Sequence, residues 1–354
     1  MKNFLFKIPF LFALFLVGLI FVVLSCSVDP EIKPSEPPLS IKEIIPAGFP
    51  QPVYNFQNNG VTTDKFILGR ALFYDPILSA DNTISCGSCH QAFAAFANAS
   101  HDLSHGINGL LGTRNSPALQ NLNWKSSFMW DGGINHLEIQ PIAPIQNPIE
   151  MGENLNNVIV KLQSKSKYLD LFRKAFGNDS ITSQRMLKAM AVFMGTLYSY
   201  NSKYDRYYRG ESGISFTSSE LNGYNIFKSK CNGCHKEPLL TDESFRNNGL
   251  AVNPLINDSG RMMITGDPND KFKFKVPSLR NVSVTSPYMH DGRFNSLSEV
   301  IDHYRSGVQQ SNTLDPSLSS GIPLTNQEKA DVINFLYTLT DYQFLYDEKF
   351  KDPN

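Results

Sequence analysis

Two short motifs in this sequence have the residue types and spacing that attach a haem covalently. They are Cys86-Gly-Ser-Cys89-His90 and Cys231-Asn-Gly-Cys234-His235. In a C-x-x-C-H motif the two cysteines lie one helical turn apart and can bond to one porphyrin, and the histidine that follows supplies an axial nitrogen to the iron. Zinc binding is the alternative, but zinc needs four ligands gathered in one place. Because each motif is complete for haem, the sequence predicts two covalently bound haems c.

Composition and charge fit a globular protein. The chain has 354 residues, of which 41% are hydrophobic and 18% charged, and its formal net charge is −1. This length allows roughly two domains. Because no basic cluster appears along the chain, we expect no nucleic acid partner.

The amino terminus has the pattern of a bacterial lipoprotein signal. Lys2 and Lys7 precede an apolar run that ends in Val-Leu-Ser-Cys26, where the cysteine would be acylated and become the first mature residue. An uncleaved membrane anchor is the alternative, although the run is at the short limit for a span. We predict a signal peptide over 1–26, a flexible tether over 27–45, and a lipid-anchored protein on the periplasmic or cell-envelope side of the membrane.

The sequence also contains an internal repeat that extends beyond the two motifs. The matched segments are residues 69–73 with 223–227, 117–121 with 277–281, and 129–132 with 289–292. Two copies of one cytochrome-like unit explain this pattern. We therefore predict a mostly α fold with two cytochrome c-like haem domains, an N-terminal one over 46–212 and a C-terminal one over 213–354.

Helices are expected to position the motifs. Capping-box patterns beginning at Thr217 and Thr325 predict two helix starts in the second half. Between the halves, apolar side chains at helical spacing predict a core helix rather than a cofactor contact. These side chains are Met186, Met190, Phe193 and Leu197. Strand-like alternation is scarce.

Taken together, these features resemble the bacterial di-haem cytochrome c peroxidase family, including its MauG-like branch. The resemblance covers roughly residues 60–345. It is carried by the segments 68–73, 114–117, 130–132, 147–151, 274–281 and 287–292 and by both C-x-x-C-H motifs. It implies that H2O2 is reduced at the N-terminal haem and that a small periplasmic protein, a cytochrome c or a cupredoxin, donates electrons through the C-terminal haem. A homodimer is compatible with it. A MauG-like enzyme that oxidises a protein substrate is the alternative, and a plain di-haem electron carrier is a third.

The resemblance also implies roles for three side chains near the first haem. Glu150 would stand over its open face and transfer protons during peroxide cleavage. Gln140 would lie beside Glu150, and Trp130 would relay electrons between the haems. The alternative for Glu150 is an exposed glutamate in an Asn-Pro turn.

Axial ligands and a calcium site follow from the same resemblance. His90 and His235 would be the proximal ligands, with His105 as the resting sixth ligand of the first iron and Tyr304 as that of the second. His101 is the competing ligand for the first iron, and His105 could instead be a solvated loop histidine. For the second iron, His303, Met289 or Met262 could be the ligand in place of Tyr304. One Ca2+ would be bound by the side-chain oxygen of Asn115 and the carbonyl oxygens of Thr285 and Pro287, which are hard donors.

Overall fold

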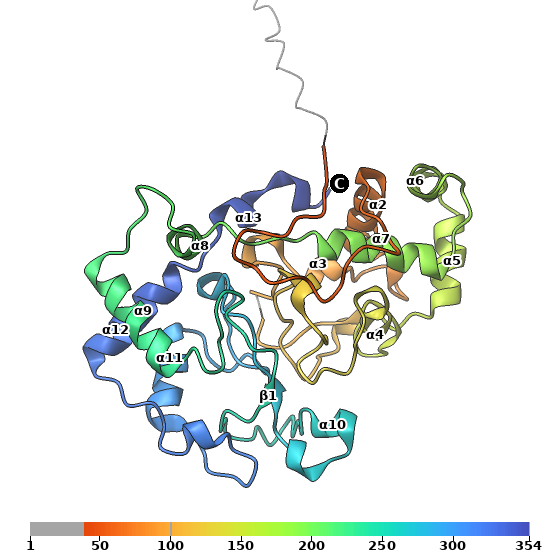
Figure 1. Ribbon diagram of the computed structural model, residues 1–354. Coiled ribbons are helices and arrows are strands. Elements are labelled where there is room, and N and C mark those ends of the chain that lie inside the picture. Colours follow the sequence, from red (N-terminus) through yellow and green to blue (C-terminus); the bar gives the residue numbers. More distant parts are fainter. Residues whose placement is uncertain (1–38, 100, 354) are drawn as a thin grey trace, which may run out of the picture. The chain divides into compact units, whose positions relative to one another are not determined.

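The computed structural model describes residues 39–99 and 101–353 (Figure 1). Ser40–Asn354 forms one compact unit built mainly of helices, as the sequence predicts. The predicted signal peptide, Cys26 and residues 27–38 of the predicted tether lie outside the described residues. Within the described part of the chain, no helix has the length and apolar character needed to cross a membrane.

A pair of packed helices organises the first half of the unit. α2 (Thr63–Tyr74) lies against α7 (Ser183–Gly195), with α5 (Leu155–Gln163) and α6 (Ser166–Phe176) beside them (Figure 1). α2 begins where the Thr62 hydroxyl accepts a hydrogen bond from the Lys65 amide at 3.2 Å, which satisfies one of the free N–H groups of the first turn. The predicted core helix is α7, although Leu197 lies just beyond its end.

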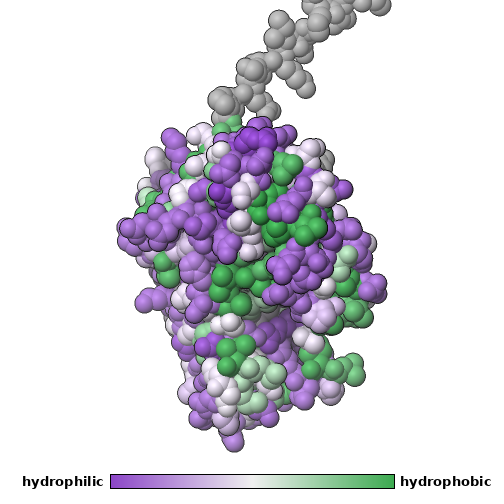
Figure 2. Space-filling view, turned by 90° about the vertical axis from the view of Figure 1, so that its right-hand side faces the viewer, coloured by the Kyte–Doolittle hydropathy of each residue, from purple (hydrophilic) through white to green (hydrophobic). Residues whose placement is uncertain are grey.

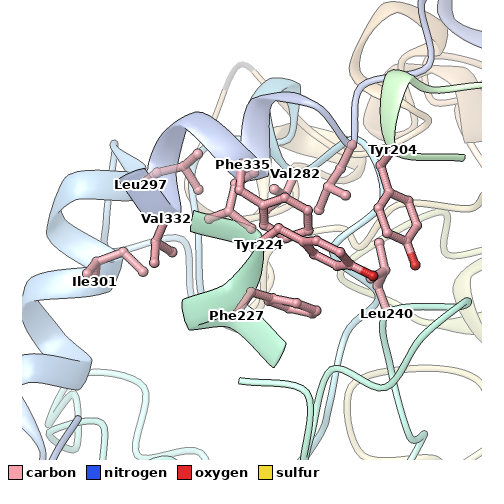
Figure 3. Packing of buried hydrophobic residues seen from close by; sticks show 11 residues of the cluster. Tyr204, Tyr224, Phe227, Leu240, Val282, Leu297, Ile301, Val332 and Phe335 are labelled. Atoms are coloured by element: carbon pink, nitrogen blue, oxygen red, sulfur yellow. The ribbon is translucent and has the colours of Figure 1, made fainter. Parts of the chain in front are cut away.

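A second pair of helices organises the other half. α9 (Ser218–Lys230) packs on α12 (Asn326–Tyr337). Both begin with the predicted capping boxes, at Thr217 and Thr325, in which a side chain at each end of the first turn satisfies a backbone amide. Figure 3 shows the buried side chains gathered around these helices, with Phe227 and Phe335 completely buried.

The remaining elements are short. The other helices are α3 (Cys86–Cys89), α4 (Ile142–Gln146), α8 (Lys203–Tyr208), α10 (Met262–Thr265), α11 (Leu297–Asp302), which runs into a π-helical turn (His303–Gly307), and α13 (Tyr342–Tyr346). Turns of 3₁₀ helix lie at Pro76–Leu78, Ala92–Ala94, Ile107–Gly109, Leu122–Trp124, Leu137–Ile139, Pro268–Asp270, Val282–Val284, Pro316–Leu318 and Glu348–Phe350. The strands β1 (Phe245–Arg246) and β2 (Phe274–Lys275) pair antiparallel.

The internal repeat is visible in the two helix pairs. A β-carbon at Gly69 in α2 would lie 2.0 Å from the Ala189 carbonyl oxygen, and one at Gly223 in α9 would lie 2.0 Å from the Asp331 carbonyl oxygen. No side chain fits at that distance, so glycine at these matched positions lets each pair approach closely. The division into domains at residues 212 and 213 stays a prediction.

A buried polar junction joins the halves at two matched asparagines. Asn121 Nδ2 donates to the Ser199 carbonyl oxygen at 2.7 Å, and Asn281 Nδ2 donates to Ser199 Oγ at 3.0 Å. Beside them the Arg280 guanidinium pairs with Asp205 at 2.7 Å. All five residues are buried. Because buried polar groups need partners, this network holds the two halves in one arrangement.

The surface of the unit is mixed in character. Figure 2 shows hydrophilic side chains over most of one face, with separate hydrophobic patches between them. Exposed large apolar side chains include Leu255, Met263 and Ile264, in α10 and the loop before it. Scattered apolar side chains are common on protein surfaces, so these alone indicate no partner.

Candidate haem sites and peroxide pocket

The first C-x-x-C-H motif opens onto the larger of the two cavities that the haem motifs line. Cys86, Cys89 and His90 all line a cavity of about 550 Å³. His90 Nδ1 lies 2.7 Å from the Phe96 carbonyl oxygen, which can only accept, so Nδ1 carries the proton and Nε2 is left for iron. Burial lowers the pKa of His90 to about 4, which keeps the imidazole neutral.

The second motif repeats this arrangement beside a smaller cavity. Cys231, Cys234 and His235 line a cavity of about 270 Å³. His235 Nδ1 lies 3.1 Å from the Pro277 carbonyl oxygen, and burial lowers the pKa of this histidine too. Two cysteines and a neutral imidazole on one cavity wall fit a haem c at each place. Among the described residues, no three His, Cys, Asp or Glu side chains gather to hold a metal ion, so the two motifs do not combine into a zinc site.

Glu150 and Gln140 are on the wall of the first cavity, together with the first motif. The Asn147 side-chain amide donates to Glu150 Oε1 at 2.8 Å and fixes the orientation of the carboxylate. Burial raises the pKa of Glu150, while the hydrogen bond from Asn147 lowers it. The side chain is partly buried, so it is not the exposed turn glutamate of the alternative interpretation. Gln140 Nε2 lies 3.8 Å from Met129 Sδ.

His105 lines the same cavity, whereas its competitor His101 is exposed and is not part of the cavity wall. The centroids of the two imidazole rings are 4.2 Å apart. The loop that carries His105 is tied to the Glu150 segment, because the Ile107 amide donates to the Glu150 carbonyl oxygen at 2.8 Å. The first motif, Glu150, Gln140 and His105 therefore meet at one cavity, although they are scattered along the chain.

Trp130 lines both cavities. Its indole Nε1 donates to the Asn115 carbonyl oxygen at 2.8 Å, and its own carbonyl oxygen accepts from the Lys275 amide at 2.8 Å. These bonds hold the ring in the wall that the cavities have in common. The residues shared by both walls are Asn115, Ser116, Pro117, Ala118, Trp130, Lys275, Val276 and Pro277.

Tyr304 lines the second cavity from the π-helical turn. Turns of this kind are rare and frequent at functional sites. Burial raises the pKa of its hydroxyl. Two of its competitors, His303 and Met262, are not on this wall, and His303 Nε2 lies 3.0 Å from the Asn248 carbonyl oxygen. Met289 is on the wall, with its sulfur 3.6 Å from Asn248 Nδ2.

The three predicted calcium ligands are on the wall of one cavity. Asn115, Thr285 and Pro287 line the second cavity. Asn115 Nδ2 donates to the carbonyl oxygens of His101 and Asp102, both at 3.1 Å. These bonds orient the amide, so its oxygen is the group presented to a cation. Amide and carbonyl oxygens are the donors that calcium takes, and the residues present fit it.

Lys275 is a buried residue of this region to which the sequence analysis assigned no role. It is 7% exposed, lines both cavities and lies 3.4 Å from Glu243 Oε2. Burial, with a smaller contribution from Lys125, lowers its pKa to about 8. Lys275 is the third lysine of the alternating run Lys271-Phe-Lys-Phe-Lys275. The sequence therefore gives no signal that this lysine is buried while the others stay more exposed, and buried lysines are uncommon.

Two haem-attachment motifs, each on its own cavity, with a tryptophan between them, define a di-haem c-type cytochrome. Residues 63–213 match the family model described as di-haem cytochrome c peroxidase. The methylamine utilization protein MauG of Methylophilus methylotrophus is 33% identical over 298 residues, which cover 83% of this chain and 86% of that protein. The chain therefore belongs to the di-haem cytochrome c peroxidase family, as its motifs predict.

Two further relatives represent both branches of the family. The cytochrome c551 peroxidase of Nitrosomonas europaea is 35% identical over 246 residues, covering 68% of this chain and 72% of that protein. A crystal structure of a MauG-like protein associated with microbial copper homeostasis has a TM-score of 0.80 and 32% identity, covering 87% of this chain and 98% of that one. The predicted fold of two cytochrome c-like haem units is thereby confirmed, while the roles of single residues stay predictions.

Proposed function

We propose that this protein reduces H2O2 to water with electrons from a small periplasmic redox protein, a cytochrome c or a cupredoxin. The observation that carries the proposal is the position of Glu150, held by Asn147, on the cavity wall that also carries Cys86, Cys89 and His90. Peroxide cleavage needs a positioned carboxylate beside the haem motif, whereas an electron carrier does not need one.

The chemistry divides between the cofactor and the chain. When bound, haem would supply the redox chemistry that splits peroxide, with two electrons and two protons giving two waters. Glu150 would take a proton from one peroxide oxygen and return it to the other, so that the leaving group departs as water. Gln140 would orient the peroxide by hydrogen bonding, and His105 would have to leave before peroxide could enter.

One experiment separates peroxidase, MauG-like enzyme and carrier. The purified holoprotein is mixed with H2O2 and a reduced small cytochrome c or cupredoxin, and donor oxidation is followed by absorbance. Continuous turnover supports the peroxidase. Haem oxidation by peroxide that decays without donor turnover favours the MauG-like enzyme, and haems that do not react with peroxide identify a carrier.

A second candidate function, MauG-like oxidation of a protein, is favoured by Tyr304. A tyrosine at this position is what the resemblance assigns to that branch, and a phenolate ligand stabilises ferric iron and makes higher oxidation states easier to reach. A methionine would instead raise the reduction potential.

The sixth ligand of the second haem is testable by spectroscopy. We expect Tyr304→Phe to change the magnetic circular dichroism of the ferric protein, because the phenolate ligand is lost, and we expect no methionine–iron charge-transfer band in the wild type. His303→Gln is the matched control, since His303 lies outside the cavity wall, and it should leave the spectrum unchanged. A methionine band that survives in Tyr304→Phe would assign the ligand to Met289 instead.

Electron transfer between the haems is expected to depend on Trp130. Trp130→Phe should leave peroxide binding intact and slow electron delivery to the first haem, because a phenyl ring is far harder to oxidise than an indole. Stopped-flow absorbance of the half-reduced protein after mixing with H2O2 measures the rate. Trp124→Phe is the control, because Trp124 is buried in the same half but lines neither cavity. Equal rates in both variants would contradict the relay.

We also propose one Ca2+ bound by Asn115, Thr285 and Pro287. The support is their position on one cavity wall and the hard oxygen donors they offer. Treatment with a chelator is expected to release one calcium per chain and to alter the absorbance of the second haem, whose cavity these residues line. Elemental analysis and absorbance before and after chelation measure both. A protein that contains no calcium as purified, yet has full activity, would contradict the site.

Residues 1–26 lie outside the described residues, so their part in the function is proposed from sequence alone. We propose that Cys26 is lipidated and that the haem unit is held on the periplasmic or cell-envelope side of the membrane by residues 27–45. The support is the apolar run that ends at this cysteine. A location outside the cytoplasm also agrees with the place where c-type haems are attached.

A further inference from the structure

An aromatic cluster packs against the second haem motif. Cys231 contacts the cluster, and Phe227, a member of it, lines the second cavity. From Phe227 the ring centroids follow at 5.0 Å to Phe335 and 5.3 Å from Phe335 to Tyr224 (Figure 3). Tyr224 is therefore two ring contacts away from the cavity wall that carries the covalent attachment.

Two tyrosines of this cluster share one carboxylate. The Tyr204 hydroxyl donates to Glu237 Oε1 at 2.9 Å, and the Tyr224 hydroxyl donates to the same oxygen at 2.8 Å. Tyr204 is completely buried and Tyr224 is 9% exposed, and their rings are 6.3 Å apart. Glu237 stands two residues after His235, so the acceptor lies in the loop that follows the second haem motif.

The cluster also reaches solvent. The ring of Tyr204 lies 5.7 Å from that of Tyr208, and Tyr208 is 43% exposed. Tyrosine rings thus continue from the interior to the surface on the side of the second haem. Phenylalanine rings shorten the path but do not hold a charge, because they are much harder to oxidise than a phenol.

The repeated scaffold does not require Tyr224 or Glu237. In the first repeat, the position of Tyr224 is occupied by Arg70, and the position of Glu237 is occupied by Ala92. Glu237 is partly buried, and placing its carboxylate there with two phenols costs desolvation energy that phenylalanine and alanine would avoid. A local departure of this kind from the repeated scaffold indicates a function specific to the second haem.

We propose that Tyr204, Tyr224 and Glu237 form a redox site that stores an oxidising equivalent as a neutral tyrosyl radical. A tyrosine would give one electron toward the second haem, when haem is bound, and so replace one of the two electrons that the reduction of H2O2 consumes. The phenolic O–H bond breaks, and its proton moves along the hydrogen bond to Glu237 Oε1. The electron is returned by the donor protein through Tyr208, and the proton returns with it. This inference rests on the proposed reaction with peroxide.

Freeze-quench electron paramagnetic resonance tests the proposal without measuring turnover. Diferric holoprotein is mixed with one equivalent of H2O2 in the absence of donor. We expect a tyrosyl signal that narrows when the protein is made with ring-deuterated tyrosine, and its loss in Tyr204→Phe/Tyr224→Phe. Tyr168→Phe is the matched control and should keep the signal. Tyr168 is also buried and donates to a carboxylate, Asp75, at 2.7 Å, but it is not a member of the cluster.

Haem absorbance recorded in the same mixing experiment distinguishes failure of the radical site from failure of the proposed reaction with peroxide. If peroxide oxidises the haems but no tyrosyl signal forms, the radical site is wrong and the proposed peroxidase function still holds. The same conclusion follows if the signal persists in Tyr204→Phe/Tyr224→Phe. Haems that do not react with H2O2 overturn both. Glu237→Gln should shorten the lifetime of the radical, and an unchanged lifetime would reject the proton transfer. If a variant fails to bind haem, wild-type protein made with ring-deuterated tyrosine still tests the proposal, because a tyrosyl signal must narrow.

Discussion

Glu150→Gln is expected to lower peroxidase turnover by about 10²–10⁴-fold, the usual contribution of a positioned acid–base group. Glutamine keeps the shape and can still bond to Asn147, but it can neither take a proton from peroxide nor return it to the leaving oxygen. Both haems should remain attached with unchanged spectra, because Glu150 is not a residue of either C-x-x-C-H motif. Turnover is measured with saturating reduced donor, so that donor binding does not limit the rate.

Glu138→Gln is the matched control for this variant. Glu138 is also partly buried and hydrogen-bonded, since it accepts from the Tyr54 hydroxyl at 2.8 Å, but it is not on the wall of the first cavity. It should turn over like the wild type. A Glu150→Gln rate equal to that of the control would mean that Glu150 is only a turn residue.

The pH profile gives an independent signature of Glu150. Its carboxylate acts as the base, so kcat/KM for peroxide falls as pH decreases through its pKa. Burial raises that pKa, which moves this acidic limb above the range of an ordinary glutamate. The limb should disappear in Glu150→Gln. If it persists there, another group is the base.

The sequence could predict the features that are local or repeated. Both haem motifs and the capping boxes at Thr217 and Thr325 depend on residues near one another in the chain, and their patterns are typical. The meeting of Glu150, Gln140 and His105 at one cavity followed only from the family resemblance. Their separation along the chain carries no distance information.

Other features depended on tertiary structure. Tyr304 and His303 are neighbours, and which of them faces the cavity is decided by the π-helical turn, which shifts the register from that of an α-helix. Met190 was expected to be core and not a cofactor contact, yet it is completely buried and also lines the first cavity. The core assignment is confirmed, and Met190 reaches the cavity because the cavity is formed within the core.

The pair Tyr204 and Tyr224 was missed for a similar reason. Each reads as an ordinary apolar position at helical spacing, and only the structure brings both hydroxyls to Glu237. One signal was present in the sequence. The repeat carries Arg70 opposite Tyr224 and Ala92 opposite Glu237, and such breaks in a repeat mark positions that the scaffold leaves free.

Arg280→Met is expected to destabilise the protein by about 3–5 kcal/mol, the usual cost of breaking a buried ion pair by removing one partner. The Arg280 side chain is 2% exposed, and its guanidinium lies 2.7 Å from Asp205, whose side chain is 3% exposed. It also donates to the Pro238 carbonyl oxygen at 2.6 Å, next to Glu237. Its loss therefore leaves a buried carboxylate uncompensated and an acceptor unpaired in the loop that follows His235.

Chemical denaturation of the holoprotein measures this change as a shift of the unfolding midpoint at constant slope. Arg173→Met is the control, because Arg173 forms ion pairs with Asp170 and Asp179 that are exposed to solvent, and it should change the midpoint little. If the cost of Arg280→Met comes from the stranded charge, Arg280→Met/Asp205→Asn should be more stable than Arg280→Met alone. If the double variant is less stable than the single one, the stability comes instead from the other hydrogen bonds of Asp205, which accepts from the Ser202 amide and hydroxyl.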